Sequence, residues 1–291
     1  MKLRSMLFVP ADSERKLAKG LGSTADALIL DLEDAVAPSR KARARQMATE
    51  FITAQAASSK AQLYVRVNPF DTGLTLGDLA AVVLPGLAGI MLPKINSAAD
   101  LVRLGHCLDA LEARAGLVAG NIATLPVATE TAPAMLQMGS FATAGSLPRL
   151  AAVTWGAEDL STAVGAIGNR EADGSYSPLY ELAASMCLCA AAAAGVPAID
   201  TVYTDFRDST GLLVACRVSR RRGFRGRMAI HPDQVAVINE SYAPSASELE
   251  HAQRIVDAFA ASPDAGALSI DGAMVDIPHL VQARRTLASS G

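Results

Sequence analysis

Three carboxylates crowd one short apolar stretch near the start of the chain. In "LILDLEDAVAP", residues 28–38, Asp31 follows three apolar residues, and Glu33 and Asp34 come after a single leucine. Acidic groups this close repel one another, and burying them without a cation is costly. The spacing therefore indicates chemistry that needs negative charge, such as the binding of a metal ion.

Later apolar runs also end in, or lead into, polar residues. These are Arg66 with Asn68, Lys94, Glu130, Glu158 with Asp159, Asp200 with Asp205, and His231. That many carboxylates at one place, with Arg66, Lys94 and His231 as the available counter-charges, would call for a bound cation. Oxygen ligands without a Cys/His cluster favour Mg²⁺ over Zn²⁺, and Mg²⁺ usually takes only one or two protein carboxylates.

Each of these residues also has an ordinary structural interpretation. Asp34 could cap the next helix, and Glu158 or Asp159 could cap "LSTAVGAIG". Lys94 and Arg66 could be salt-bridge partners. The functional hypothesis rests on the whole set falling at the same end of consecutive elements.

Eight short apolar runs, separated by helix-like segments, would position these residues. The runs are "SMLFVP" (5–10), "ALILDLE" (27–33), "QLYVRVNP" (62–69), "GIMLPK" (89–94), "TLPVATE" (124–130), "AAVTWGAE" (151–158), "PAIDTV" (197–202) and "GRMAIHP" (226–232). Most are continuously apolar, as parallel strands buried on both faces are. The pattern predicts a (β/α)8 barrel, whose active site lies at the carboxyl ends of the strands. An open doubly wound sheet is the alternative, weakened as a dinucleotide-binding fold because no Gly-x-Gly-x-x-Gly follows the first run.

The connecting segments carry helix signals, and the last segment stands apart from the eightfold pattern. Ser97 and Gly116 bound one predicted helix, and Ser177 with Pro178 begins another. We expect residues 1–242 to form the barrel and residues 243–291 a C-terminal lid or arm. In that arm, residues 245–261 predict a capped helix, and residues 270–288 predict a turn and a final helix.

The composition limits the class of protein. The chain has 291 residues, of which 51% are hydrophobic and 19% charged, and its net charge is −3. This allows a large core and gives no sign of a nucleic-acid or membrane partner. No apolar stretch approaches the roughly 18 residues of a membrane helix, and the N-terminal run is too short for a signal peptide. We therefore expect a cytoplasmic protein whose four cysteines are free thiols.

A series of segments, taken in order, resembles one enzyme family. They are "RSMLFVPADSERKLAKG", "LILDLEDAVAP", "VRVNP", "IMLPK", "ATETA", "WGAEDLSTAVGA", "AIDTVYTDFRDSTGL", "GFRGRMAIHPDQ" and "IDGAMVDIP". Over essentially its whole length the chain resembles the citrate lyase β-subunit-like group of the HpcH/HpaI aldolase family, and within it the stand-alone citramalyl-CoA and malyl-CoA lyases. The resemblance implies a (β/α)8 barrel that needs Mg²⁺, for which Mn²⁺ can substitute. It also implies a homo-oligomer, a trimer or a hexamer, whose C-terminal arm closes a neighbouring subunit's site.

Carried over by position, the resemblance implies roles for individual residues. Glu130 and Asp159 match the two Mg²⁺ ligands, Arg66 matches an arginine that contacts the substrate beside the metal, and Asp276 matches an acidic residue of the C-terminal arm. Other matching residues lie around the metal without binding it directly: Asp31, Glu33, Asp34 and Lys94. A further set lies in the segment near the CoA phosphates: Arg15, Lys16 and Lys19.

The implied reaction is cleavage of a β-hydroxyacyl-CoA to acetyl-CoA and an α-keto acid. Mg²⁺ would hold the hydroxyl and carboxylate oxygens, Arg66 would stabilise the enolate, and Asp276 would protonate it. The reverse condensation and thioester hydrolysis stay open, as does the identity of the acyl group. The alternative is a citrate lyase β subunit that acts on an acyl-carrier-protein thioester in a complex.

Two further hypotheses fit less well. The "AMVDIP" segment and the basic N-terminal segment argue against a CoA-free pyruvate aldolase. The presence of Arg66, Glu130, Asp159 and Asp276 argues against an inactive CoA-binding module.

Overall fold

The computed structural model describes residues 2–289 and divides into two compact units. One unit spans Leu3–Asn239, and the other begins at Glu240 and includes Lys2. The predicted division into 1–242 and 243–291 also covers Met1 and residues 290–291, which lie outside the described residues. We describe each unit by itself.

The first unit is built on eight parallel strands. They are β1 (Ser5–Pro10), β2 (Ala27–Asp31), β3 (Gln62–Arg66), β4 (Gly89–Leu92), β5 (Ala123–Pro126), β6 (Val153–Thr154), β7 (Ala198–Asp200) and β8 (Gly226–Ala229). Their order is β5-β4-β3-β2-β1-β8-β7-β6. Backbone hydrogen bonds from Thr124 N to Arg149 O (2.7 Å) and from Ala128 N to Thr154 O (2.8 Å) then join the two edges. The predicted (β/α)8 barrel is thus confirmed, and the open sheet is wrong.

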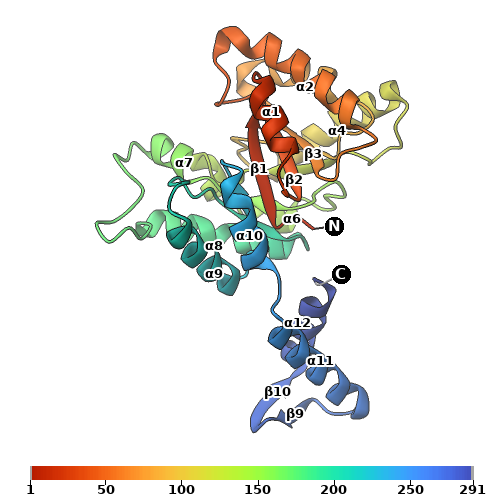
Figure 1. The fold of residues 1–291 in the computed structure, drawn as a ribbon, viewed down its shortest axis with the longest axis vertical. Helices are drawn as coiled ribbons and strands as arrows, with labels where there is room; N and C mark the ends of the chain where they lie inside the picture. The colour runs from red at the N-terminus through yellow and green to blue at the C-terminus, as the bar shows by residue number, and fades with distance from the viewer. Residues whose placement is uncertain (1, 290–291) are drawn as a thin grey trace. The chain divides into compact units, whose positions relative to one another are not determined.

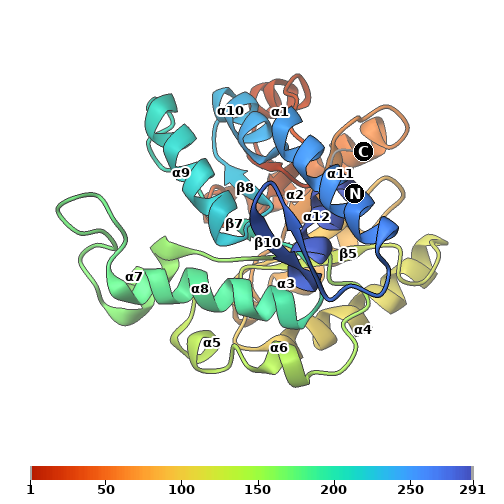
Figure 2. The same cartoon turned by 90° about the horizontal axis from the view of Figure 1, so that it is seen from below.

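Helices connect the strands and lie on the outside of them (Figure 1, Figure 2). They are α1 (Glu14–Leu21), α2 (Lys41–Gln55), α3 (Thr75–Val82), α4 (Ala98–Ala115), α5 (Ala132–Leu136), α6 (Ser140–Thr143), α7 (Ala157–Val164), α8 (Pro178–Ala193), α9 (Ser209–Arg222) and α10 (Asp233–Tyr242), with 3-10 turns η1 (Pro38–Arg40) and η2 (Phe70–Thr72). Helix α4 begins and ends as predicted: Ser97 caps it, and Gly116 ends it with φ 67°. Among residues 2–289, no helix is both long and apolar enough to cross a bilayer.

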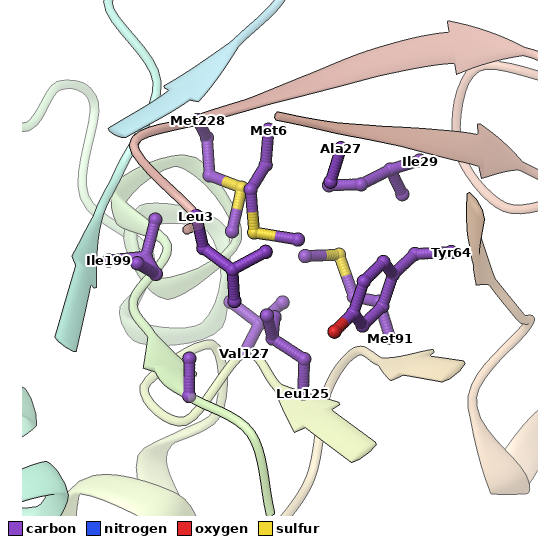
Figure 3. Close-up of a cluster of buried hydrophobic side chains, with 11 residues drawn as sticks. Leu3, Met6, Ala27, Ile29, Tyr64, Met91, Leu125, Val127, Ile199 and Met228 are labelled. Carbon is purple, nitrogen blue, oxygen red and sulfur yellow. The ribbon is translucent and has the colours of Figure 1, made fainter. Parts of the chain in front are cut away.

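Apolar side chains from the strands and from residues close to their ends fill the barrel (Figure 3). They are Leu3, Met6, Ala27, Ile29, Tyr64, Met91, Leu125, Val127, Ala152, Ile199 and Met228. Ala27 and Ile29 are two residues apart, as expected for side chains on the same face of a strand. Gly89 makes room for the largest of them, because a Cβ there would lie 2.4 Å from Cε1 of Tyr64. The packed interior leaves the carboxyl ends of the strands to carry the polar residues.

The second unit is a small helix–hairpin–helix with its own core. It comprises α11 (Ala246–Ala261), β9 (Ala267–Ile270), β10 (Ala273–Asp276) and α12 (Ile277–Ala288). Ser245 and Glu248 form a capping box, so the predicted start of α11 is confirmed. The antiparallel hairpin was not predicted; its turn is Asp271-Gly272, with φ 53° and 79°. Asp-Gly favours such two-residue turns, so the sequence did carry a signal for it.

Candidate active site at the carboxyl ends of the strands

A double hydrogen bond joins the last residues of β2 and β3. Asp31 and Arg66 are register partners, so their side chains leave the sheet side by side. Arg66 donates from Nε to Asp31 Oδ1 (2.8 Å) and from Nη2 to Oδ2 (2.6 Å), and its guanidinium lies 4.6 Å from the ring centre of Phe8. Burial alone would lower the pKa of Arg66, but hydrogen bonds and charge from Asp31, with Glu33, raise it. Arg66 is thus a fixed, permanently charged group.

Glu33 lies between two cations. Its Oε1 accepts a hydrogen bond from Lys94 Nζ, and its Oε2 lies 3.0 Å from Arg66 Nη1. That second contact is electrostatic, because Oε2 is buried and lacks a partner in hydrogen-bond geometry. Burial still raises the pKa of Glu33, against the opposing effect of Arg66 and Lys94. Glu33 therefore links the Arg66 pair to Lys94.

Lys94 connects the acidic residues of this site. Its Nζ lies 2.9 Å from Asp34 Oδ2 and 3.4 Å from Asp159 Oδ1, and its backbone N–H donates to Glu130 Oε2 (2.7 Å). Its φ is 50°, in the left-handed region that residues other than glycine rarely adopt. Such strain is found where the surroundings fix a functional geometry. Here the left-handed backbone allows Lys94 to contact Glu130 through its N–H group and three other carboxylates through its side chain.

The protein offsets the negative charge of Glu130 only weakly. It is 5% exposed, and burial raises its pKa well above the usual value, helped by the charges of Asp159 and Glu33. Gly156, directly before α7, makes room for it, because a Cβ there would lie 2.8 Å from Glu130 Cγ. Two hard oxygen ligands, Glu130 and half-exposed Asp159, with a deficit of positive charge suit a cation such as Mg²⁺. Among residues 2–289 no group of three or more His, Cys, Asp or Glu could hold a metal, so water or substrate would complete the coordination.

A pocket of about 450 Å³ opens at these carboxylates. Its walls come from the segments that follow β3, β4, β5 and β6, and they include Lys94, Glu130 and Asp159. The predicted group of Asp31, Glu33, Asp34, Lys94, Arg66, Glu130 and Asp159 is thus brought together by the fold. The protein itself tolerates the crowding of the first three carboxylates, because each of them contacts Arg66 or Lys94.

Three residues counted with the site from their strand positions have other partners. Asp200 pairs with Arg227 and accepts a hydrogen bond from Trp155 Nε1 (2.7 Å), so the sequence prediction missed its counter-charge. His231 stacks on Phe206, with ring centres 4.8 Å apart, rather than pairing with the carboxylates of the network. Glu158 accepts a hydrogen bond from Asn169 (2.9 Å).

The basic residues of α1 lie beside the segment that follows β8. Arg15, Lys16 and Lys19 are exposed, and Lys19 Nζ lies 3.4 Å from His231 Nε2. The helix begins at Glu14, where Ser13 caps it. These exposed positive charges could attract an anionic ligand to this edge of the barrel.

Asp276 belongs to the second unit, at the start of α12. Its Oδ1 lies 2.5 Å from His279 Nδ1, and its backbone nitrogen lies 3.2 Å from the same ring nitrogen. The hydrogen bond from His279 lowers the pKa of Asp276. Asp276 is thus an ionised carboxylate held next to an imidazole.

Three supporting residues escaped the sequence prediction. The ring of Phe8 packs against the guanidinium of Arg66, and Gly156 leaves space for Glu130. Lys41 Nζ donates hydrogen bonds to the carbonyls of Leu32 and Glu33, at 2.7 Å each. Gly156 had a signal, since a glycine at the end of a predicted strand, two residues before an acidic pair, can mark a close backbone approach. Phe8 and Lys41 had none, because their contacts depend on tertiary packing.

Comparisons with known proteins identify the family of the chain and agree with its fold. The family model described as HpcH/HpaI aldolase/citrate lyase matches residues 4–232. A (3S)-malyl-CoA thioesterase of Cereibacter sphaeroides is 36% identical, over 99% of this chain and 94% of the relative. Human mitochondrial citramalyl-CoA lyase is 32% identical, over 98% of this chain and 84% of the relative. A crystal structure of CitE from Mycobacterium tuberculosis with magnesium, acetoacetate and coenzyme A matches with TM-score 0.76 and 32% identity, over 99% of this chain and 98% of that one.

Proposed function

Because the chain belongs to the HpcH/HpaI aldolase/citrate lyase family, we propose that it is a Mg²⁺-dependent acyl-CoA carbon–carbon lyase. Its substrate is a β-hydroxyacyl-CoA of the citramalyl-CoA or malyl-CoA type, which it cleaves to acetyl-CoA and an α-keto acid. The observation that carries this proposal is a buried Glu130 beside Asp159, next to a guanidinium fixed by two hydrogen bonds to Asp31. The relatives that act on malyl-CoA and citramalyl-CoA support the substrate class.

Glu130 and Asp159 are the residues that would hold the cation. When bound there, Mg²⁺ would supply positive charge to the hydroxyl and carboxylate oxygens of the substrate and lower the pKa of the hydroxyl. The magnesium in the related CitE structure supports this assignment, and we propose that Mn²⁺ can substitute. Gly156 and the backbone N–H of Lys94 keep Glu130 in place.

Arg66 stabilises the negative charge that the cleavage creates. The substrate hydroxyl gives up its proton to water as the C–C bond breaks. The electron pair of that bond moves onto the thioester as an enolate, and the hydroxyl-bearing carbon becomes the keto carbon. Arg66 carries five N–H donors and uses two of them on Asp31, so others remain for the enolate oxygen. Preorganised donors of this kind give large rate effects because they need no rearrangement during the reaction.

Asp276 transfers the proton at the enolate carbon. Its lowered pKa keeps the carboxylate ionised, and the ionised form is the one that removes a proton from acetyl-CoA in the reverse condensation. In the cleavage direction it must first receive a proton, for which His279 is the adjacent donor. We propose that Asp276 reaches the active site of a neighbouring subunit in a homotrimer or hexamer.

CoA itself is held at the edge of the barrel formed by α1. Arg15, Lys16 and Lys19 present three exposed positive charges there, which suit the phosphates of CoA. Hydrolysis of the thioester is a second reaction that the same site could carry, as the related thioesterase suggests. The alternative is a citrate lyase β subunit, acting on an acyl-carrier-protein thioester in a larger complex.

We also propose that the protein works in the cytoplasm. The four cysteines, Cys107, Cys187, Cys189 and Cys216, are thiols and not disulfides. Thiols persist where the surroundings are reducing.

The test is a product analysis with purified protein and citramalyl-CoA, malyl-CoA and citryl-CoA. We expect equimolar acetyl-CoA and α-keto acid from citramalyl-CoA or malyl-CoA when Mg²⁺ is present. Release of CoA together with an intact hydroxy acid would contradict C–C cleavage. Activity only on acyl-carrier-protein thioesters, with copurification of a carrier subunit, would favour the alternative.

A further inference from the structure

The pocket at Glu130 and Asp159 extends well beyond the two carboxylates. Its volume is about 450 Å³, whereas a water molecule takes about 30 Å³ in the liquid. The walls away from the carboxylates include Phe70 and Arg103. A pocket of this size has room for a substituent longer than hydrogen or methyl on the hydroxyl-bearing carbon of the substrate.

Arg103 is a positive charge in this pocket without an anionic partner. It is exposed on α4, and its guanidinium lies 3.9 Å from the ring centre of Phe70. Within residues 2–289 it forms no ion pair, whereas Lys94, the other cation lining the pocket, contacts three carboxylates. A guanidinium stacked on an aromatic face can still bind a carboxylate with two hydrogen bonds from its in-plane N–H groups.

The other charged groups of the pocket leave Arg103 available. They are Asp71, Asp100, Glu130 and Asp159. Asp100 accepts a hydrogen bond from the backbone of Asn96 (2.7 Å), and Glu130 and Asp159 face the proposed cation. A divalent cation at Glu130 and Asp159 would offset the charges of these two carboxylates, which leaves the charge of Arg103 for an added anion.

The strand order indicates how the substrate would lie across the mouth of the barrel. The pocket lies over β3, β4, β5 and β6, while the basic residues of α1 follow β1. In a closed barrel of this order β1 and β5 are diametrically opposed. A thioester arm that runs toward α1 therefore leaves the substituent of the hydroxyl-bearing carbon pointing toward Phe70 and Arg103.

We propose that Arg103 is a specificity-determining residue that binds a carboxylate at the end of this substituent. The site then takes, besides citramalyl- and malyl-type substrates, a thioester whose α-keto acid product is a dicarboxylate, as for the carboxymethyl group of citryl-CoA. Phe70 holds the guanidinium in place for it. This inference rests on the proposed lyase function and adds the class of substituent.

The test compares kcat/KM for citryl-CoA and citramalyl-CoA in four forms of the full-length protein: wild type, Arg103→Met, Arg103→Lys and Arg114→Met. Arg114 lies on the same helix outside the pocket, so its variant is the matched control. Loss of a charged hydrogen-bonded contact should lower kcat/KM for citryl-CoA about 10- to 100-fold in Arg103→Met, and less for citramalyl-CoA, under about 3-fold. Arg103→Lys should retain part of the preference, and Arg114→Met should match the wild type.

The outcomes separate this inference from the proposed function. Equal loss on both substrates, or no loss on citryl-CoA, would overturn the role of Arg103. Wild-type cleavage of citramalyl-CoA without cleavage of citryl-CoA would also overturn it and leave the lyase function standing. No cleavage of any of these thioesters would overturn the lyase function itself.

Discussion

At the scale of single residues, the network separates carboxylates that the protein neutralises from those it does not. Asp31 is matched by Arg66, and Glu33 and Asp34 contact Lys94. Glu130 receives one backbone hydrogen bond and a raised pKa. The need for a cation is therefore concentrated at Glu130 and its neighbour Asp159.

Lys94 allows a test of backbone strain at this site. Lys94→Asn and Lys94→Ala both remove the ammonium group, but asparagine tolerates a positive φ better than alanine does. We expect Lys94→Asn to be about 1 kcal/mol more stable than Lys94→Ala in urea unfolding. Equal stabilities, or a more stable Lys94→Ala, would show that the φ of 50° carries no strain.

The sequence predicted which residues gather at the site but not which of them pair. Asp31, Glu33 and Asp34 stood out because of their spacing, whereas the partnership of Asp31 with Arg66 depends on the register of β2 against β3. The ion pair of Asp200 with Arg227 joins adjacent strands in the same way. Register is set by the whole sheet, so local patterns could not supply it.

At the scale of elements, the short connections between strands and helices position much of the site. β6 has only two residues, Val153 and Thr154, and Gly156 follows almost at once. The close approach of this backbone to Glu130 couples the start of α7, which carries Asp159, to the end of β5. Continuous apolar runs were enough to predict the barrel, because both faces of each strand are covered.

Gly156→Ala tests this coupling. The added methyl group would lie 2.8 Å from Glu130 Cγ and 3.0 Å from its Oε1, so Glu130 must move. We expect kcat to fall about 10- to 100-fold with folding intact, since a displaced catalytic group is costly. Gly168→Ala is the control, because nothing lies within 4 Å of its added Cβ. Cleavage rates at saturating substrate check this, and a fully active Gly156→Ala would refute the coupling.

A buried ion pair anchors α4 to the start of β5. Glu112 is fully buried and accepts hydrogen bonds from Arg149 Nη1 (2.8 Å), from Arg149 Nη2 (2.6 Å) and from the backbone of Ile122 (2.6 Å). Burial would raise the pKa of Glu112, but the hydrogen bonds from Arg149, Ile122 and Gly120 lower it to about 2. The anchor therefore stays charged at any pH near neutrality.

This anchor predicts acid sensitivity. A pKa that is lower in the folded state stabilises the protein above the unfolded value of 4.5 and loses that effect as the pH falls toward about 2. The contribution is on the order of 3 kcal/mol. In urea unfolding between a pH of about 5 and about 2, Glu112→Gln should lose that much less stability than the wild type. Parallel losses in both proteins would argue against the anchor.

At the scale of the whole molecule, the chain forms two units that each carry part of the proposed chemistry. Arg66, Glu130 and Asp159 belong to the barrel unit, and Asp276 belongs to the C-terminal unit with its separate core of Ile255, Phe259, Val275 and Leu280. The Asp271-Gly272 hairpin of that unit was missed because the neighbouring strands are too short and exposed to show a clear pattern.

Coexpression of Arg66→Met with Asp276→Asn tests whether Asp276 acts across subunits. Each variant alone should be inactive. In a mixed oligomer about one quarter of the sites would combine an intact Arg66 with an intact Asp276 from a neighbour, so about that share of activity should return. Cleavage assays on the mixed oligomers check this, and a mixture as inactive as its parents would rule out action across subunits.

The dependence of C–C cleavage on free Mg²⁺ tests the central claim most directly. We predict that chelator-treated wild-type protein is inactive and regains activity with added Mg²⁺, and that Glu130→Gln loses more than about 1,000-fold at saturating Mg²⁺. Asp31→Asn should need only about 10- to 100-fold more Mg²⁺ for half-maximal activity, because it acts through Arg66. Metal-independent cleavage, or Glu130→Gln with wild-type activity, would contradict the account.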